Sequence, residues 1–237
     1  PKAVLRGPKK YGGHGDPSLY TRKGFQQLQL MLGHIRNKDE QGGMTRQAIE
    51  VSQLTAGTMR PILEAKGDTD WMGWIEDTWV KDVKRFLTSI GAGVMIMQQW
   101  QPKIQRQGDS FLMGHIPKES NIKSTQQINR CRMFLQALTV SDISTPDGKS
   151  VDRNILKGIL NNARTSIYVW PNQKKIFRQG MQIWESFVRS TLCKHGTLEL
   201  KSPLGKWIRG NTHHQWRIFQ HPITKNLYRL HGSETSQ

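Results

Sequence analysis

The sequence predicts a mainly α protein: a multi-helical array with a short strand near residues 94–97 and a small C-terminal β-hairpin. Apolar residues recur at the three- and four-residue spacing of a helix face in several segments, which glycine and proline separate. The apolar run at 94–97 follows a glycine and is too brief for a helix, whereas 215–219 and 227–230 are β-prone segments joined by a turn. These three observations give the fold class.

The length of 237 residues allows one large domain or two smaller ones, either with enough volume for a core. The polar stretch at 161–166 is the favoured boundary. Residues 1–160 are therefore predicted to form a helical region, and residues 161–237 a region made of a basic helix and the β-hairpin.

The first predicted helix follows the turn at 16–20, and the Thr21 hydroxyl can cap it. Its apolar face carries Phe25, Leu28, Leu32 and Ile35. The glycine pair at 42–43 is predicted to end this helix. Thr45 then caps a second helix, which Gly57 ends.

A continuous apolar stripe between Asp70 and Ile90 predicts one long helix. Its members are Trp71, Ile75, Trp79, Val83, Phe86 and Ile90. Tryptophan-rich stripes of this spacing are typical of a protein core. Gly91 and Gly93 end the helix, and the predicted strand at 94–97 follows them.

In the middle of the chain, Asp109 is predicted to cap a short helix at 111–112, and Ser124 to cap a longer one. One face of the longer helix carries Ile128, Cys131, Leu135 and Leu138. Arg130 and Arg132 lie off that face, where an arginine pair is usually solvated.

Residues 139–143 are predicted to be extended and residues 146–148 to form a turn, after which Asp152 caps one short helix. Pro171 is well suited to open a long helix. The apolar side of that helix comprises Met181, Trp184, Phe187, Val188 and Leu192.

Charge is the strongest indication of function, because 35 Lys and Arg residues face 18 Asp and Glu residues, a net charge of +17. Residues 153–237 hold 14 of the basic and only 3 of the acidic side chains. Such an excess repels itself unless a polyanion or solvent screens it, so RNA, DNA or a hybrid of them is the predicted partner. Ribosome-associated, membrane-surface and merely very soluble proteins can also be this basic.

Neither an apolar run of about 18 residues nor a secretory signal is present, which predicts an intracellular protein of the nucleus or cytoplasm without a membrane partner. The first residue is Pro1, which favours a piece of a longer polyprotein. Cys131 and Cys193 are too few for a disulfide framework and are predicted to be small buried hydrophobes.

Basic and aromatic residues are interleaved from Tyr168 to Arg229. Lysine and arginine would neutralise phosphates, and an exposed tryptophan could stack on an unpaired base. The alternative is that each tryptophan belongs to the core. The predicted nucleic-acid-binding residues are Lys174, Lys175, Arg178, Arg189, Lys206, Trp207, Arg209, Arg217, Lys225 and Arg229.

No catalytic residue, metal or cofactor is predicted. Polymerases hold two metal ions with clustered aspartates, and the chain has no Asp-Asp pair. The Gly148-Lys149-Ser150 triplet ends like a phosphate-binding loop but lacks the glycine five positions earlier, where Ile143 stands.

Two further constellations are weak. His214 and Arg217 with Tyr228 have the residue types of tyrosine recombinases, but the separation leaves no room for the helix that this family requires, and packing in a hairpin is favoured. Cys193 and the histidines of the C-terminal region could supply zinc ligands, but their spacing is irregular.

The N-terminal segment contains an ordered set of motifs: Gly7-Pro8, Gly12-Gly13, Gly15, the turn at 16–20, and a helix with Gly24, Leu28, Leu32 and Arg36. Three further pieces follow it, at 105–113, 128–143 and 147–148. Taken together, and in their order and spacing, these motifs resemble the region that follows the catalytic palm in polyproteins of non-LTR retrotransposons. The chain departs from the pattern at His14 and at Pro17-Ser18.

This resemblance implies a thumb-like helical region or a connection beyond the palm, which helps to grip template and primer beside a neighbouring polymerase domain. It implies no catalytic residue in this chain. A non-catalytic nucleic-acid-binding segment of a reverse transcriptase is therefore the predicted function. The alternatives are a structural or interaction module with a charged surface and a DNA recombinase or nuclease domain.

Overall fold

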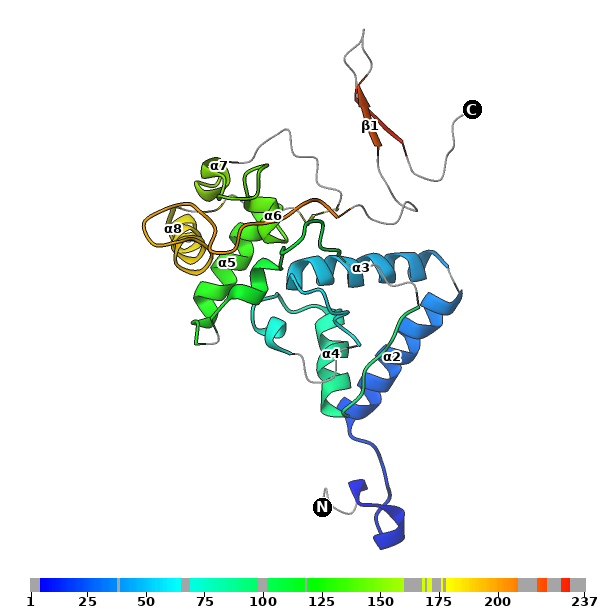
Figure 1. Ribbon diagram of the computed structural model, residues 1–237. Helices are drawn as coiled ribbons and strands as arrows, with labels where there is room; N and C mark the ends of the chain where they lie inside the picture. The colour runs from blue at the N-terminus through cyan, green and yellow to red at the C-terminus, as the bar shows by residue number, and fades with distance from the viewer. Residues whose placement is uncertain are drawn as a thin grey trace.

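The protein is mainly α, as the sequence predicts (Figure 1). A computed structural model describes residues 5–37, 39–64, 69–97, 102–117, 119–159, 168, 170–171, 176 and 178–208, and the backbone of two strands. Those strands, β1 (Arg217–Gln220) and β2 (Leu227–Leu230), pair antiparallel. The connection between them lies outside the described residues, so the hairpin stays a prediction.

The chain enters through a short 3-10 helix, η1 (Lys9–Tyr11), and then forms α2 (Leu19–Asn37) and α3 (Glu40–Ala56). Ser18 rather than the predicted Thr21 lies at the start of α2, since its Oγ accepts the Thr21 N–H at 3.1 Å. Gly57 ends α3 in the left-handed conformation, at φ +69°, as predicted.

The glycine pair at 42–43 does not separate the two helices, and Thr45 is not a cap. Both glycines lie inside α3, whose first turn is capped by Asp39 through the Gly42 N–H at 2.6 Å. A Cβ on Gly42 would collide with the His34 carbonyl oxygen of α2. Gly42 is therefore a point of close helix approach rather than a helix breaker.

The predicted single helix between Asp70 and Ile90 is wrong. The segment forms a 3-10 turn, η2 (Asp70–Gly73), and a separate helix, α4 (Trp79–Ser89). Thr78 interrupts them with an extended backbone, and its Oγ1 accepts the Lys81 N–H at 3.3 Å. Most of the stripe is nevertheless buried, whereas Trp79 and Ile90 are exposed.

Residues 94–97 are not a β-strand. Val94 N–H donates to the Leu63 carbonyl at 2.9 Å, but no strand pairs with the segment in the described part of the chain. Val94 and Ile96 pack on the core, and Met95 and Met97 are exposed. Exposure therefore alternates as it does in a β-strand, but the described residues contain no strand that pairs with this segment.

The second half contains short helices and two longer ones. They are η3 (Leu112–His115), α5 (Ile122–Phe134), α6 (Val140–Ile143), α7 (Arg153–Leu156), α8 (Arg178–Phe187) and its continuation as a π-helix, η4 (Val188–Leu192). Asp152 caps α7, as predicted, and Gly148 forms its predicted turn at φ +71°.

Three local predictions in this half are wrong. Asn121 rather than Ser124 caps α5, because its Oδ1 accepts the Lys123 N–H at 2.8 Å. Residues 140–143 are helical rather than extended, because Thr139 and Asp142 form a reciprocal capping box; Thr139 itself, the N-cap, has an extended backbone. Asp109 caps no helix at 111–112; its Oδ1 accepts the N–H groups of Ser110 and Ser141 at 2.8 and 2.9 Å.

Two apolar clusters organise the described residues (Figure 1). The first lies among α2, α3, α4 and η2, with Ile49 and Trp71 fully enclosed. The second joins α5, α6 and α7 to α8 and η4, with Trp184 at its centre. The second cluster therefore draws residues from both sides of residue 160. The predicted boundary at 161–166 lies outside the described residues and stays a prediction.

Arg132 joins the two clusters, and its predicted solvated position is wrong. Its side chain is 0% exposed, whereas Arg130 is exposed. The guanidinium donates to the carbonyls of Leu54 and Thr55, at 2.7 and 3.0 Å, and to that of Ala137 at 3.2 Å. It thereby supplies donors to carbonyls at the C-terminal end of α3, where the Asn129 amide also donates to the Thr55 carbonyl at 3.0 Å.

Candidate nucleic-acid interface

Two segments that are far apart in sequence form a small ladder on the surface of the second cluster. Gln107 N–H donates to the Lys206 carbonyl at 3.0 Å, and Ile208 N–H donates to the Gln105 carbonyl at 2.7 Å. Between these bonds, Arg106 pairs with Trp207 as an antiparallel bridge. The ladder fixes the backbone on which Lys206 and Trp207 are carried.

Arg106 contacts the Trp207 ring. The arginine is 4% exposed, and its Nε and Nη1 donate to the carbonyls of Gly205 and Pro146 at 3.0 and 3.2 Å. Its guanidinium carbon lies 4.9 Å from the centroid of the Trp207 ring, which is the geometry of a cation–π contact. The indole is nevertheless 58% exposed. Trp207 is thus held by a buried cation and still presents a large apolar surface to solvent.

The turn at 145–150 packs beside this ladder and adds charge. Gly148 has a left-handed backbone, and a Cβ there would lie 2.5 Å from Arg106 Nη2. Exposed Lys149 is fixed next to it, because its carbonyl accepts the Leu200 N–H at 2.8 Å. The Thr145 hydroxyl and then the Lys149 N–H hold the pKa of Asp147 below its ordinary value. One carboxylate therefore accompanies the cations of this surface.

Lys206 is exposed and has no acidic partner among the residues that the structure describes. The group formed by Trp207, Lys206, Lys149 and the buried Arg106 is called the Trp207 platform here. It combines an exposed aromatic ring, held by the ladder and by Arg106, with exposed lysines on adjoining segments. Such a combination can stack on a base and neutralise the adjoining phosphates.

Other predicted binding residues in the described part lie on α8 and η4. Arg178 is exposed at the start of α8. Arg189 is exposed as well, but its Nε lies 2.8 Å from Glu185 Oε1. Lys206 and Trp207 therefore lie on the ladder, whereas Arg178 and Arg189 lie on α8 and its continuation η4.

The other six predicted binding residues lie wholly or partly outside the described part of the chain. Lys174, Lys175, Arg209 and Lys225 lie outside the described residues, and only the backbone of Arg217 and Arg229 is described. Sequence reasoning missed Arg106 and Lys149. Nothing local distinguishes Arg106 from a surface arginine, because its partners come from two distant segments.

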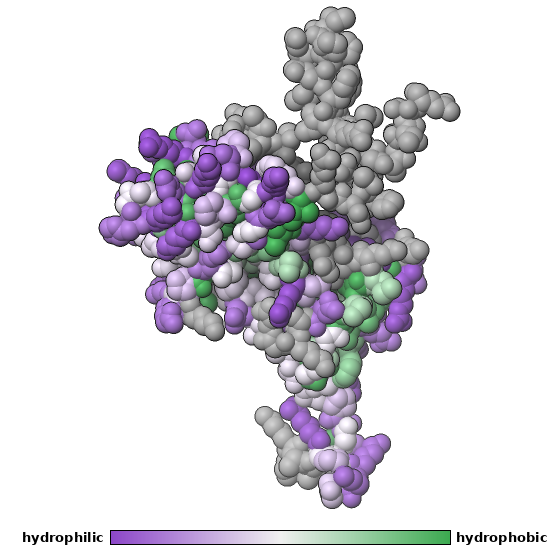
Figure 2. Space-filling view, viewed as in Figure 1, coloured by the Kyte–Doolittle hydropathy of each residue, from purple (hydrophilic) through white to green (hydrophobic). Residues whose placement is uncertain are grey.

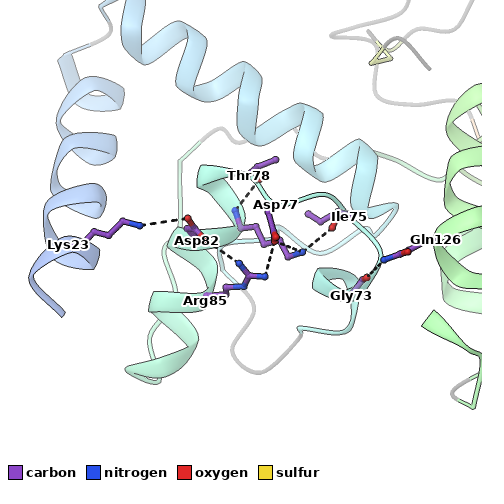
Figure 3. A network of polar contacts seen from close by, with 9 residues as sticks. Lys23, Gly73, Ile75, Asp77, Thr78, Asp82, Arg85 and Gln126 are labelled. Atoms are coloured by element: carbon purple, nitrogen blue, oxygen red, sulfur yellow. Dashed lines mark hydrogen bonds and ion pairs between the residues drawn. The ribbon is translucent and has the colours of Figure 1, made fainter. Parts of the chain in front are cut away.

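The first cluster has basic residues of a different kind, since they are paired with acids (Figure 3). Asp77 Oδ1 lies 3.0 Å from Lys81 Nζ and 2.9 Å from Arg85 Nη2. Asp82 bonds Arg85 at 3.2 Å and lies 4.0 Å from Lys23 of α2. Hydrogen bonds from Lys81 and then Arg85 lower the pKa of Asp77. These cations are therefore largely neutralised within the fold.

Figure 2 shows hydrophilic residues covering much of the visible surface over α5, α7 and α8. The described residues contain no group of three or more His, Cys, Asp and Glu side chains able to hold a metal ion. Cys193 is buried, and burial raises the pKa of its thiol. None of the helices in the described ranges is long and apolar enough to cross a membrane.

Comparison of the chain with protein families, with curated proteins and with solved structures gives no match.

Proposed function

We propose that this chain is a non-catalytic nucleic-acid-binding segment of a retroelement reverse transcriptase polyprotein. In this proposal it grips template or primer beside a neighbouring polymerase domain, inside the cell, and supplies no catalytic group of its own. The motif resemblance supports the family, and the net charge of +17 supports the class of partner.

The Trp207 platform is the single observation that carries the binding proposal. The Trp207 indole presents more than half of its surface to solvent, at 58% exposure. The ladder holds its backbone, and the Arg106 guanidinium carbon lies 4.9 Å from the centroid of its ring, so the ring is held in place before a partner binds. A prearranged ring loses little conformational entropy when a base stacks on it.

The surroundings of the ring favour a nucleic acid over an apolar partner. Lys206 precedes Trp207 in the chain, and Lys149 follows Gly148, which lies against Arg106; both lysines are exposed. In this proposal they bind the phosphates on either side of the stacked base. Release of counterions from that backbone adds affinity that falls as salt rises. Stacking tolerates every base, so the platform would bind single strands without strong sequence preference.

The test is to measure binding of a fluorescent single-stranded RNA to the full chain and to its Trp207→Ala variant. Loss of one stacked base should weaken binding by roughly tenfold to a hundredfold, corresponding to about 1 to 3 kcal/mol. Trp79→Ala is the matched control, because Trp79 is also exposed, at 39%, but lies at the start of α4, outside the Trp207 platform.

Equal affinities for wild type and Trp207→Ala would refute the platform. Thermal unfolding of both variants must accompany the measurement, because Trp207 also contacts Arg106 and its loss could unfold the ladder. Trp207→Phe provides the second comparison. It keeps an aromatic face on the same backbone and should recover most of the lost affinity.

A further inference from the structure

Residues 5–16 form a closed loop outside both apolar clusters, called the N-terminal loop here. Its two ends meet where Asp16 N–H donates to the Leu5 carbonyl and Gly15 N–H to the Gly7 carbonyl, each at 2.9 Å. The Pro8 carbonyl accepts from both Tyr11 and Gly13, at 2.9 and 3.2 Å. The loop is thus fixed by its own backbone.

Glycines make this closure possible. Gly12 and Gly15 have φ values of +80° and +68°, where a side chain would be strained. A Cβ on Gly13 would collide with the Gly7 backbone. The sequence therefore specifies one particular loop shape, although no residue of η1 within it is buried. Such a shape contributes little burial to the fold, so its effect is to present its side chains.

The presented side chains are basic and aromatic. Tyr11 is 77% exposed, and Lys10 Nζ lies 4.8 Å from the centroid of its ring. Arg6 and Lys9 are exposed as well. Among the residues that the structure describes, none of these three cations makes an ion pair, and Asp16 is the one acidic residue of the loop.

The loop repeats the chemistry of the Trp207 platform at a different place. Figure 1 shows it projecting beyond the end of α2 and away from α5, α7 and α8. The ion pairs of Lys23, Lys81 and Arg85 lie on α2 and α4, between the loop and the second cluster. Among the described residues, the cations of the N-terminal loop and those of the Trp207 platform therefore lie on separate surfaces.

We propose that the N-terminal loop is a second contact for the phosphate backbone and bases of the nucleic acid strand that the Trp207 platform binds. This inference rests on the proposed function and extends it from one surface to two. Tyr11 offers a ring for stacking, while Arg6, Lys9 and Lys10 face phosphates. A strand long enough to reach both surfaces is bound bivalently, whereas a short one occupies a single surface.

The experiment compares the full chain with a triple variant, Lys9→Gln, Lys10→Gln and Tyr11→Ala, on single-stranded RNA of two lengths. For a strand of about 40 nucleotides we expect at least about a tenfold loss of affinity, because bivalency is removed. For a strand of about 8 nucleotides, which one surface accommodates, we expect a change of at most about threefold.

The matched control is Arg22→Gln with Lys23→Gln, which removes two exposed cations from α2 close to the loop. It should leave the affinity for the long strand within about threefold of wild type, because neither cation belongs to the proposed contact and Lys23 already lies 4.0 Å from Asp82. Ultraviolet crosslinking provides a direct readout. In the wild type, the long strand should crosslink to the peptide that contains Tyr11.

The outcomes separate this inference from the proposed function. If Trp207→Ala weakens binding and the triple variant does not, the second contact is refuted and the platform stands. If the triple variant and the cation control weaken binding equally, general charge rather than the loop is responsible, and the inference fails. If the wild-type chain binds no RNA of either length, both proposals are overturned.

Discussion

At the scale of single residues, the burial of Arg132 depends on partners that are distant in the chain. It donates hydrogen bonds to the carbonyls of Leu54, Thr55 and Ala137 and to Asn129 Oδ1. Burial lowers the pKa of its guanidinium to about 9, which still leaves it charged at neutral pH. A buried cation is tolerated here because its N–H groups meet acceptors.

We expect Arg132→Met to lower the free energy of unfolding by at least about 2 kcal/mol, because it leaves several buried carbonyls without donors. Urea unfolding followed by circular dichroism measures the change. Arg130→Met is the matched control on the same helix, and its exposed side chain should change stability by less than about 0.5 kcal/mol. Similar losses in the two variants would refute the linking role of Arg132.

His115 gives a pH dependence whose direction follows from its burial. Desolvation lowers its pKa below the ordinary 6.5, although the charge of Asp109 opposes this, and Nε2 lies 2.6 Å from Ser110 Oγ. The unfolded chain therefore takes up a proton at higher pH than the folded one. The contribution of neutral His115 to the free energy of unfolding is fully present above about pH 6.5, and it is lost as the pH falls through the lower pKa of the folded state.

Urea midpoints for wild type and His115→Gln at about pH 7.5 and about pH 5.5 test this dependence. The midpoint should fall less on acidification in the variant, which has no imidazole to protonate. His195→Gln removes an exposed histidine and should retain the wild-type pH dependence. An unchanged dependence in His115→Gln would show that other groups account for it.

Sequence reasoning treated Arg130 and Arg132 alike, although their positions on α5 differ. Arg132 follows Ile128 by one helical turn and lies on the buried side of α5, but helical periodicity does not reveal which distant segment packs there. The carbonyls that bind Arg132 come from α3 and from the turn after α5. Trp207 is a partial success: its exposure was predicted as one of two alternatives, but its support by Arg106 was not.

At the scale of elements, glycines set how closely the helices of the first cluster approach. Phe86 of α4 is 1% exposed and lies against Gly24 of α2, between the rings of Tyr20 and Phe25. The ring centroids of Phe25 and Phe86 are 5.1 Å apart, in an edge-to-face arrangement. A Cβ at Gly24 would collide with the Phe86 ring.

Gly24→Ala should therefore destabilise the protein by about 1 to 3 kcal/mol, despite the higher helix propensity of alanine. Gly33→Ala is an internal control in the same helix, since a Cβ at Gly33 meets nothing within 4 Å. It should stabilise the protein by roughly 0.5 to 1 kcal/mol. Thermal or urea unfolding measures both, and a shift of the same sign in the two variants would contradict the packing account.

At the scale of elements, local capping signals succeeded at Asp152 and Gly57 but not at Thr45 or Ser124, because a residue type that can cap a helix does not fix where the helix begins. Of the predicted stripe, Trp71, Ile75, Val83 and Phe86 are buried as expected, whereas Trp79 is exposed and the segment is not one helix. Its burial pattern survives the interruption at Thr78, so the apolar spacing alone could not reveal the break.

At the scale of the whole molecule, ion pairs are found in both halves of the described chain, but not at the Trp207 platform. Asp82 of α4 and Asp77, which precedes α4, form ion pairs with Lys23, Lys81 and Arg85 (Figure 3). Around the Trp207 platform, Lys206 and Lys149 form no ion pair within the described ranges. The sequence indicated that the C-terminal third is the more basic, but ion pairing depends on the fold and could not be predicted from composition.

The most direct test of the central claim, that the chain binds nucleic acid through unpaired cations and an exposed ring, is a salt series. Affinity for a single-stranded RNA of about 40 nucleotides is measured between about 50 and about 300 mM NaCl. We predict that log K falls linearly with log[NaCl] at a slope of about −3 or steeper, which corresponds to about four or more phosphate contacts at about 0.7 each. Binding that is absent at low salt, or that does not weaken as salt rises, would contradict the account.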